Sequence, residues 1–224
     1  MILVDMNQVT ISNLMIQMKN EPLSVDLVRH LVLNSIRSYR TKFFNEFGEL
    51  ILCYDDKHYW RRDLFPYYKS NRKKDRTESN LNWNELFETL NLIRDELKET
   101  FPYKVLQVDG AEADDIIATI VNLVSKTPNL FEKILIMSGD KDFIQLQTHE
   151  NVQQYSPTLK KFINGVDPNT YKIEHIFKGD RGDGIPNILS PDNTFVEGLR
   201  QKPLGKNKID CLLYTSPSPR DSDQ

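Results

Sequence analysis

The chain has 224 residues, of which 39% are hydrophobic and 27% are charged, and its formal net charge is −3. This composition excludes a disordered chain, and no apolar run approaches the roughly 18 residues of a membrane span. Two cysteines, Cys53 and Cys211, are too few for a disulfide framework or a zinc site, and the first residues lack the pattern of a secretory signal. We therefore expect a cytoplasmic protein with no membrane partner.

Four short apolar runs predict strands, over residues 1–4, 50–54, 103–108 and 134–137. Helical spacing of apolar residues between them predicts one helix capped by Ser24, one that opens at Asn84 and one over residues 113–124. Strands that alternate with helices are typical of an α/β fold with a mostly parallel central sheet flanked by helices.

The segment 59–83 interrupts this alternation and is too long for an ordinary connector. From Arg61 to Arg76 it holds seven basic and two acidic residues, interleaved with aromatic residues. Cations bind phosphates and aromatic rings stack on unpaired bases, so we interpret the segment as a basic arch that binds nucleic acid; a solvated charged face is the alternative. The residues expected to bind nucleic acid here are Arg61, Arg62, Tyr68, Lys73, Lys74 and Arg76, and Tyr59, Trp60 and Tyr67 are further candidates for stacking.

Acidic residues follow nearly every predicted strand. Because ligands of open α/β sheets bind outside the carboxyl ends of the strands, we expect these side chains to converge. Any one of them could instead cap a helix or stabilise a turn, but a crowd of carboxylates is tolerated best when cations neutralise it. Oxygen ligands favour Mg²⁺ or Mn²⁺, and two ions about 3.5–4 Å apart would suit displacement at phosphorus. The acidic residues are Asp5, Asp55, Glu112, Asp114, Asp115, Asp140, Asp142, Asp180 and Asp183.

Three of these acids open the third predicted helix. Glu112 and Asp115 share a helix face, whereas Asp114 points about 100° away from Asp115, so the three cannot bind one ion in the same way. We favour Glu112 and Asp114 as metal ligands, and Asp115 as a residue behind the ligands or as the helix cap.

Six short motifs occur in one order along residues 1 to about 210. They are Asp5 after the first strand, CYDD with YWRRD, YKSNR at 68–72, EADD at 112–115, SGDKDF at 138–143 and KGDRGDGIP at 178–186. In this combination the chain resembles the 5′ nuclease (flap endonuclease) superfamily, and within it the ribonuclease H branch of T-even phages. The resemblance implies a PIN-like nuclease domain over residues 1–178, which includes the arch, and a partial helix–three-turn–helix DNA-binding region over residues 179–210.

The resemblance also implies the chemistry of the site. It implies two Mg²⁺ ions, for which Mn²⁺ would substitute, with Lys69 and Arg72 acting on the scissile phosphate. It implies cleavage near the 5′ ends of RNA–DNA hybrids, duplex DNA and 5′ flaps during removal of primers in phage replication, by a monomer that could work with a phage single-strand-binding protein and a sliding clamp. The ligands of one metal ion would be Asp5, Asp55, Asp114 and Asp140. The ligands of the other would be Asp142, Asp180 and Asp183, and Glu112 would reach this ion directly or through water. Lys206 and Lys208 would bind nucleic acid.

Two features depart from the family's pattern. The region 185–209 lacks a tidy glycine-rich hairpin, and the C-terminal helices expected of the phage enzyme do not follow it. Residues 211–221, CLLYTSPSPRD, can be encoded by a transposase-type sequencing adapter read in frame. We therefore expect the natural sequence to stop near residue 210 and residues 211–224 to be disordered; a genuine Ser/Pro-rich tail is the alternative.

Two other functions compete with nuclease activity. A haloacid-dehalogenase-like phosphohydrolase would need a second Asp where Asn7 stands, and would leave the basic arch unexplained. A structure-selective nucleic-acid binder without efficient catalysis should have lost some of the acidic residues, yet none of the expected acids is replaced.

Overall fold

The computed structural model describes residues 1–17, 24–72, 76, 82–127 and 132–215. The chain forms two compact units, one of Met1–Trp60 with Asn82–Gly165 and one of Arg61–Leu81 with Val166–Gln224. The sequence had suggested a boundary after residue 178, with the arch in the first domain. The structure instead groups the arch with the later residues, because the backbone N–H of Lys69 donates to the carbonyl of Asp183 at 2.8 Å.

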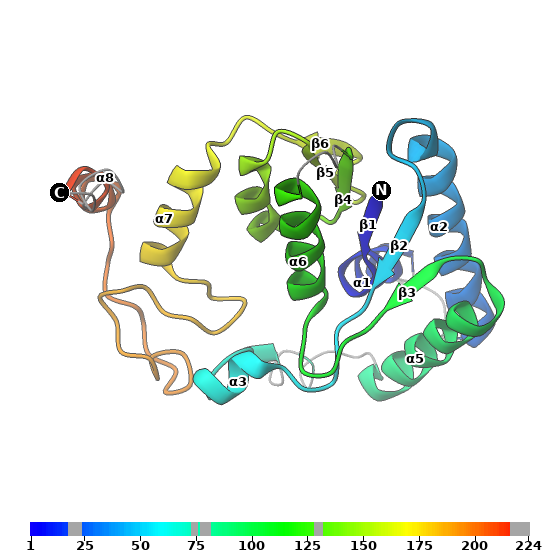
Figure 1. Cartoon of the computed structure of the whole chain (residues 1–224). Helices are drawn as coiled ribbons and strands as arrows, with labels where there is room; N and C mark the ends of the chain where they lie inside the picture. Colours follow the sequence, from blue (N-terminus) through cyan, green and yellow to red (C-terminus); the bar gives the residue numbers. More distant parts are fainter. Residues whose placement is uncertain (18–23, 73–75, 77–81, 128–131, 216–224) are drawn as a thin grey trace. The chain divides into compact units, whose positions relative to one another are not determined.

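The first unit contains a six-stranded sheet of order β3-β2-β1-β4-β5-β6 (Figure 1). The strands are β1 (Ile2–Asp5), β2 (Leu50–Cys53), β3 (Lys104–Leu106), β4 (Ile134–Met137), β5 (Val152–Ser156) and β6 (Lys161–Ile163). All neighbours are parallel except the pair β5 and β6, which is antiparallel. The four predicted strands and the mostly parallel sheet are therefore confirmed, while β5 and β6 had not been predicted.

The register of the sheet aligns the carboxyl ends of its central strands. Ile2 of β1 pairs with Leu50 on one side and with Leu135 on the other. As a result Asp5, the last residue of β1, lies opposite Cys53, and the loops that follow β1, β2 and β4 leave the same edge of the sheet. This edge is where open α/β sheets bind ligands.

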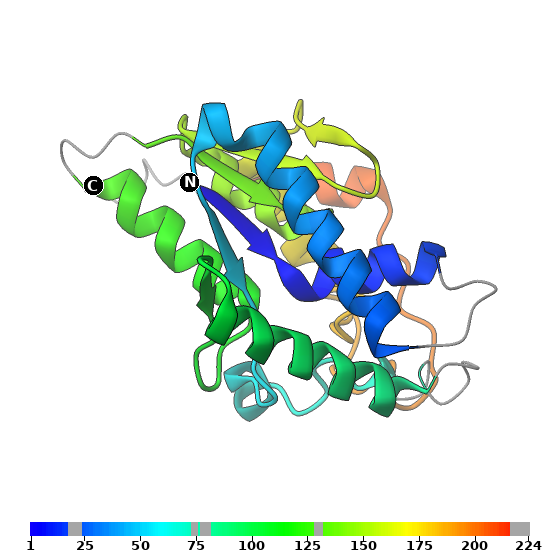
Figure 2. The same cartoon turned by 90° about the vertical axis from the view of Figure 1, so that its right-hand side faces the viewer.

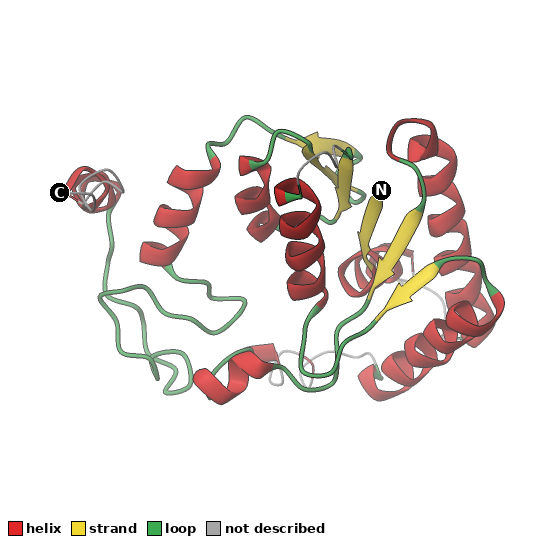
Figure 3. Ribbon diagram, viewed as in Figure 1, coloured by secondary structure: helices red, strands yellow, loops and turns green. Residues whose placement is uncertain are grey.

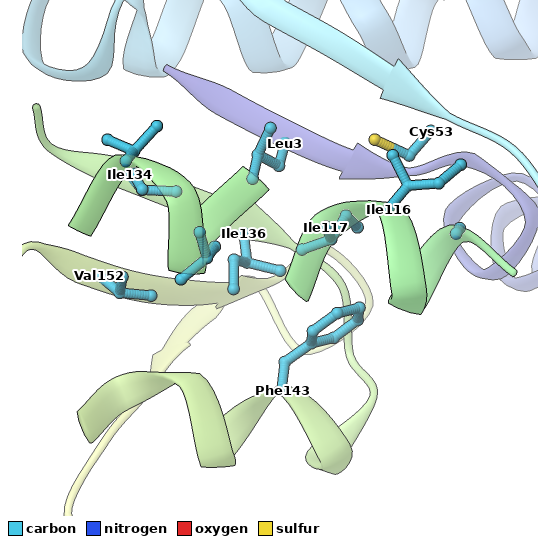
Figure 4. Close-up of a cluster of buried hydrophobic side chains, with 11 residues drawn as sticks. Leu3, Cys53, Ile116, Ile117, Ile134, Ile136, Phe143 and Val152 are labelled. Atoms are coloured by element: carbon cyan, nitrogen blue, oxygen red, sulfur yellow. The ribbon is translucent and has the colours of Figure 1, made fainter. Parts of the chain in front are cut away.

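Helices cover both faces of the sheet (Figures 2 and 3). On one face, α2 (Val25–Phe47) contacts both α1 (Met6–Gln17) and α5 (Trp83–Thr100). On the other face, α6 (Ala113–Lys126) and the 3₁₀ helix η1 (Lys141–Thr148) pack against β1, β2 and β5. Figure 4 shows the second interface, where Leu3 and Cys53 meet Ile117 of α6 and Phe143 of η1. Successive residues of a strand point to opposite faces, which explains why every residue of β1 is buried.

The predicted helices are present, with one shifted start. Ser24 caps α2 by accepting a hydrogen bond from the backbone N–H of Leu27 at 3.2 Å. The second predicted helix begins at Trp83, because Asn82 and not Asn84 is its cap and accepts from the N–H of Glu85 at 3.3 Å. The third is α6, and α1 and η1 had not been predicted.

The second unit contains α7 (Pro168–Lys178) and α8 (Lys206–Thr215), joined by a long series of turns. The short helix α3 (Trp60–Leu64) begins at the end of the first unit. Gly179 ends α7 with a φ of +66°, and a Cβ there would lie 2.4 Å from the carbonyl oxygen of Ile185, so only glycine fits this turn. A helical element therefore begins at Pro168, eleven residues before the boundary suggested by the sequence.

Helix α8 includes Cys211 to Thr215, the first part of the stretch that we expected to be disordered. Helix α8 continues through these residues because no proline occurs before Pro217 to stop it, and Ile209 anchors it with only 2% of its surface exposed. Residues 216–224 lie outside the described part of the chain. In that described part, none of the helices has the length and apolar character to span a bilayer.

Candidate active site

The site of the first unit is centred on Asp5. Its carboxylate is 4% exposed; Oδ1 accepts from the N–H of Gln8 at 3.1 Å and Oδ2 from the hydroxyl of Ser138 at 3.0 Å. Burial, reinforced by the negative charges of Asp55 and Asp140, raises the pKa of Asp5 to about 7 although the two hydrogen bonds lower it. An ionised carboxylate at this position is therefore costly unless a cation accompanies it.

Asp55 connects the end of β2 to the start of α6. Its Oδ1 accepts from the backbone N–H of Ala113, the first residue of the helix, at 2.7 Å. The neighbouring Asp56 has a different role: its carboxylate accepts from the N–H of Gly110 at 2.9 Å, and this hydrogen bond holds the pKa of Asp56 below its usual value. Asp55 thus faces the acidic cluster, while Asp56 ties the loop after β2 to the loop before α6.

The start of α6 separates the roles of its three acids. Glu112 precedes the helix and is 1% exposed, and Asp114 lies in the first turn. Asp115 Oδ2 accepts from the backbone N–H of Glu112 at 2.9 Å and from the indole N–H of Trp60 at 3.1 Å. Asp115 is therefore the third helical residue of a capping box whose N-cap is Glu112, and it also fixes Trp60, whose surface is 46% exposed.

The turn after β4 carries the next two acids. Asp140 lies three residues after β4, and its backbone N–H donates to the Ser138 hydroxyl at 3.1 Å. Its carboxylate Oδ1 accepts from the N–H of Asp142 at 3.0 Å and so caps η1. In the described part of the chain, Asp5, Asp55 and Asp140 are not paired with any Lys, Arg or His.

Asp180 and Asp183 belong to the second unit, in the turn after α7. Asp180 Oδ1 accepts from the N–H of Asp183 at 3.1 Å, and its Oδ2 lies 3.7 Å from Nε2 of His175. Asp183 Oδ1 accepts from Arg72 at 2.8 Å and lies 4.0 Å from Nζ of Lys69. The two cations predicted to act on a phosphate are therefore paired with one of the predicted metal ligands.

Tyr68 corrects a prediction about the arch. We expected it to bind nucleic acid, but its surface is only 5% exposed, and Nζ of Lys69 lies 4.9 Å from its ring centroid. Its ring is thus committed to packing. Lys69 is itself 8% exposed and has a φ of +54°, a left-handed conformation that is uncommon for a side chain of this length and is maintained by its contacts with Asp183.

The remaining predicted contacts to nucleic acid divide into three groups. Arg62 and Lys208 are exposed, and Arg61 and Arg76 are half-buried. Lys206 is the first residue of α8. Lys73 and Lys74 lie outside the described residues. Arg62 and Lys208 therefore lie at the surface, where a contact with a phosphate is sterically possible.

Three polar residues of the site were not predicted from the sequence. Ser138 and Gln154 are almost completely buried, and Gln8 accepts from the backbone N–H of Gly139 at 3.2 Å. Ser138 begins the SGDKDF motif, so its proximity to the acids could have been inferred. Gln154 lies twelve residues after Asp142, the last predicted acid of this unit, and no pattern in the sequence connects it with the site.

Comparison with known proteins gives a consistent result. The family model described as 5′-3′ exonuclease, N-terminal resolvase-like domain, matches residues 14–176. Ribonuclease H of Enterobacteria phage T4 is 36% identical over 221 residues, which cover 94% of this chain and 71% of that protein. A 5′-3′ exonuclease of Buchnera aphidicola subsp. Schizaphis graminum is 30% identical over 164 residues, 70% of this chain and 53% of that protein.

Similarity extends to solved structures. The phage T5 flap endonuclease, solved in a pseudo-enzyme-product complex with DNA and metal ions, superposes with a TM-score of 0.67 at 20% identity, covering 96% of this chain and 84% of that chain. At this level of identity the match establishes the fold, a mostly parallel sheet with flanking helices of the PIN-like nuclease type.

Proposed function

The chain belongs to the family of 5′-3′ exonuclease N-terminal domains, and from that premise we propose that it is a divalent-metal-dependent nuclease. The observation that carries this proposal is the buried carboxylate of Asp5, whose pKa is raised to about 7 beside Asp55 and Asp140. Above this pKa, the ionised carboxylate lowers the stability of the folded protein. Its retention at the carboxyl edge of the sheet is explained if a cation binds there.

The donor set fits a hard divalent ion. Asp5, Asp55, Asp114 and Asp140, with Glu112, offer only carboxylate oxygens, and such oxygens favour Mg²⁺ and Mn²⁺ over softer metals. These residues would hold the ion. When bound, the ion supplies an activated water and stabilises negative charge at a phosphate. The choice of Mg²⁺ and the presence of a second ion rest on the family resemblance.

The hydrogen bonds of the site orient the proposed ligands. The hydroxyl of Ser138 and the backbone N–H of Gln8 each donate a hydrogen bond to one carboxylate oxygen of Asp5. The backbone N–H of Ala113 donates to one carboxylate oxygen of Asp55. Each bond fixes a carboxylate without neutralising it, and each oxygen retains a lone pair that it can direct to a cation. The residues around the acids therefore act as a preformed support.

Lys69 and Arg72 are proposed to act on the scissile phosphate. The Arg72 guanidinium donates to Asp183 Oδ1 at 2.8 Å, and a phosphate oxygen is an acceptor of the same kind. A guanidinium held in this way can neutralise charge that develops on the phosphate during cleavage. Its carboxylate partner keeps the side chain extended before the substrate arrives.

The names of the relatives support a proposal for the substrate class. One is named a ribonuclease H, one a 5′-3′ exonuclease, and one was solved as a flap endonuclease with DNA. We propose hydrolysis of phosphodiesters near the 5′ ends of RNA–DNA hybrids, duplex DNA and 5′ flaps, in removal of primers during phage replication. The chain spans 71% of the T4 protein and about half of the Buchnera protein. We also propose that it acts as a monomer, together with a single-strand-binding protein or a sliding clamp.

The test is cleavage of a 5′-labelled flap and a 5′-labelled RNA–DNA hybrid, with Mg²⁺ and with EDTA. We expect cleavage only with Mg²⁺, and a loss of several orders of magnitude in Asp140→Asn and Asp114→Asn, with binding to the flap retained. Asp109→Asn is the matched control, because Asp109 is an exposed acid in the loop that precedes α6, outside the proposed set of metal ligands. Near-normal turnover by either site variant would contradict the metal assignment, and binding without cleavage by the unaltered protein would favour the non-catalytic binder.

A further inference from the structure

Gln154 is a buried amide on the strand next to the acidic turn. It lies in β5, where it is 1% exposed, whereas its neighbour Gln153 is exposed. Burial of an amide is unfavourable unless its donors and acceptor all find partners. The position of those partners indicates what the side chain does.

All the polar atoms of Gln154 are used. Nε2 donates to the carbonyl of Ser138 at 3.0 Å and to the carbonyl of Asp140, and Oε1 accepts from Nε2 of Gln147 at 3.1 Å. The amide therefore joins both ends of the three-residue turn that follows β4. Its acceptor is held in turn by η1, so the side chain has one orientation.

The turn that Gln154 holds is the one that builds the acidic site. Ser138 donates its hydroxyl to Asp5, and Asp140 contributes its own carboxylate. Between them, the N–H of Gly139 donates to Gln8 Oε1 at 3.2 Å, so a second side chain also holds this turn. The space is tight, since a Cβ on Gly139 would lie 3.1 Å from Nε2 of Gln8 and 3.2 Å from the Ser156 hydroxyl.

We propose that Gln154 is a positioning residue that sets the affinity of the acidic site for a divalent cation. It touches no reacting atom; it acts through the backbone of the turn, which fixes the spacing between the Asp5 and Asp140 carboxylates. The proposal rests on the proposed metal-dependent function. Removing a group that orients the metal ligands without contacting the metal typically lowers metal affinity or activity by about 10-fold to 100-fold.

Gln154→Met tests this, because methionine is close to glutamine in shape and lacks its donors. The measurement is direct binding of Mn²⁺ to the nucleic-acid-free full chain by electron paramagnetic resonance, with circular dichroism as the check on folding. We expect binding weakened by about 10-fold or more in Gln154→Met, and unchanged in Gln153→Met, the control on the same strand. An affinity within twofold of the unaltered protein would overturn the proposal. If the unaltered protein itself failed to bind Mn²⁺, the proposed function would fall instead.

A second variant covers the case in which Gln154→Met does not fold. Gln147→Met removes only the partner of Oε1 and leaves the two bonds to the turn in place, so it should fold and weaken Mn²⁺ binding by a smaller factor, about threefold to tenfold. Cleavage as a function of Mg²⁺ gives an independent readout: the midpoint should move to higher Mg²⁺ while turnover at saturating Mg²⁺ recovers. A loss of turnover that is the same at every Mg²⁺ concentration, with an unmoved midpoint, would indicate a merely structural role and overturn the proposal.

Discussion

Replacing Asp5 by Asn should stabilise the metal-free protein while removing its activity. The folded state holds the Asp5 carboxyl with a pKa of about 7, against an ordinary value of 3.8. Folding therefore favours the protonated form, so the contribution of Asp5 to stability is fully present below pH 3.8 and is lost as the pH rises to about 7. Asn is uncharged throughout this range, so the stability of the Asn variant does not fall as the pH rises from 3.8 to about 7 on account of this position.

The size of the effect follows from the shift in pKa. A difference of about three pKa units, at about 1.4 kcal/mol each, makes the ionised carboxylate cost about 4 kcal/mol above pH 7. Asn can accept only one of the two hydrogen bonds from Gln8 and Ser138 in the present arrangement, which offsets about 1 kcal/mol. The net gain should be about 2 to 3 kcal/mol, or roughly 5–10 °C in Tm for a chain of this size.

Thermal unfolding in EDTA at pH 8 and at pH 4.5 measures this effect. The advantage of Asp5→Asn should be large at pH 8 and small at pH 4.5, where most of the cost of ionisation has gone. Excess Mg²⁺ should reverse the order at pH 8, because only the unaltered protein then gains stability from binding. An Asn variant that is no more stable than the unaltered protein at pH 8 would refute the description of Asp5 as an uncompensated buried acid.

Other predictions concern the second unit and the turn that ends α7. Lys69→Ala and Arg72→Ala should lower the single-turnover rate at saturating DNA, whereas Arg62→Ala, at an exposed position, should mainly weaken binding and reduce its salt dependence by about one unit of slope. If all three variants change affinity alone, the arch is not part of the catalytic apparatus. Gly179→Ala should destabilise the protein by more than about 1 kcal/mol, since its φ of +66° and the carbonyl oxygen 2.4 Å from a Cβ both oppose a side chain; an unchanged Tm would mean that this turn can rearrange.

The sequence predicted the centre of the sheet because local patterns determine it. The four predicted strands are apolar runs bounded by polar residues, a pattern typical of parallel strands, and β1, β2 and β4 are indeed largely buried. β5 escapes the same rule because two of its five residues are glutamines. Gln154 is buried there only because carbonyls of a distant turn accept from it, and no local pattern contains that information.

The helices that were missed have two different explanations. Helix α7 carried a recognisable start, because Asp167 accepts from the N–H of Thr170 at 2.7 Å and Pro168 is the first residue. Helix α1 follows β1 directly, and Asp5, the last residue of the strand, caps it by accepting from the N–H of Gln8 at 3.1 Å, so the strand and the cap share one residue. The acidic residues were predicted as a group, but the division of roles between Asp55 and Asp56 depends on which backbone N–H each one meets.

The two sets of acids differ in how their charge is balanced, and this difference predicts opposite responses to the same substitution. Among the described residues, Asp5 has no basic partner, whereas Asp183 pairs with Arg72 at 2.8 Å and lies 4.0 Å from Lys69, whose side chain is 9% exposed. Asp183→Asn should therefore destabilise the metal-free protein by about 1 to 2 kcal/mol. The ion pair with Arg72 contributes little to this, because the Arg72 side chain is 45% exposed to solvent. Most of the cost arises because the buried ammonium group of Lys69 loses a nearby negative charge. Thermal unfolding in EDTA at pH 8 compares the two variants directly. A stabilised Asp183→Asn would mean that the repulsion among acids outweighs the pairing with Arg72, and that Asp183 behaves like Asp5.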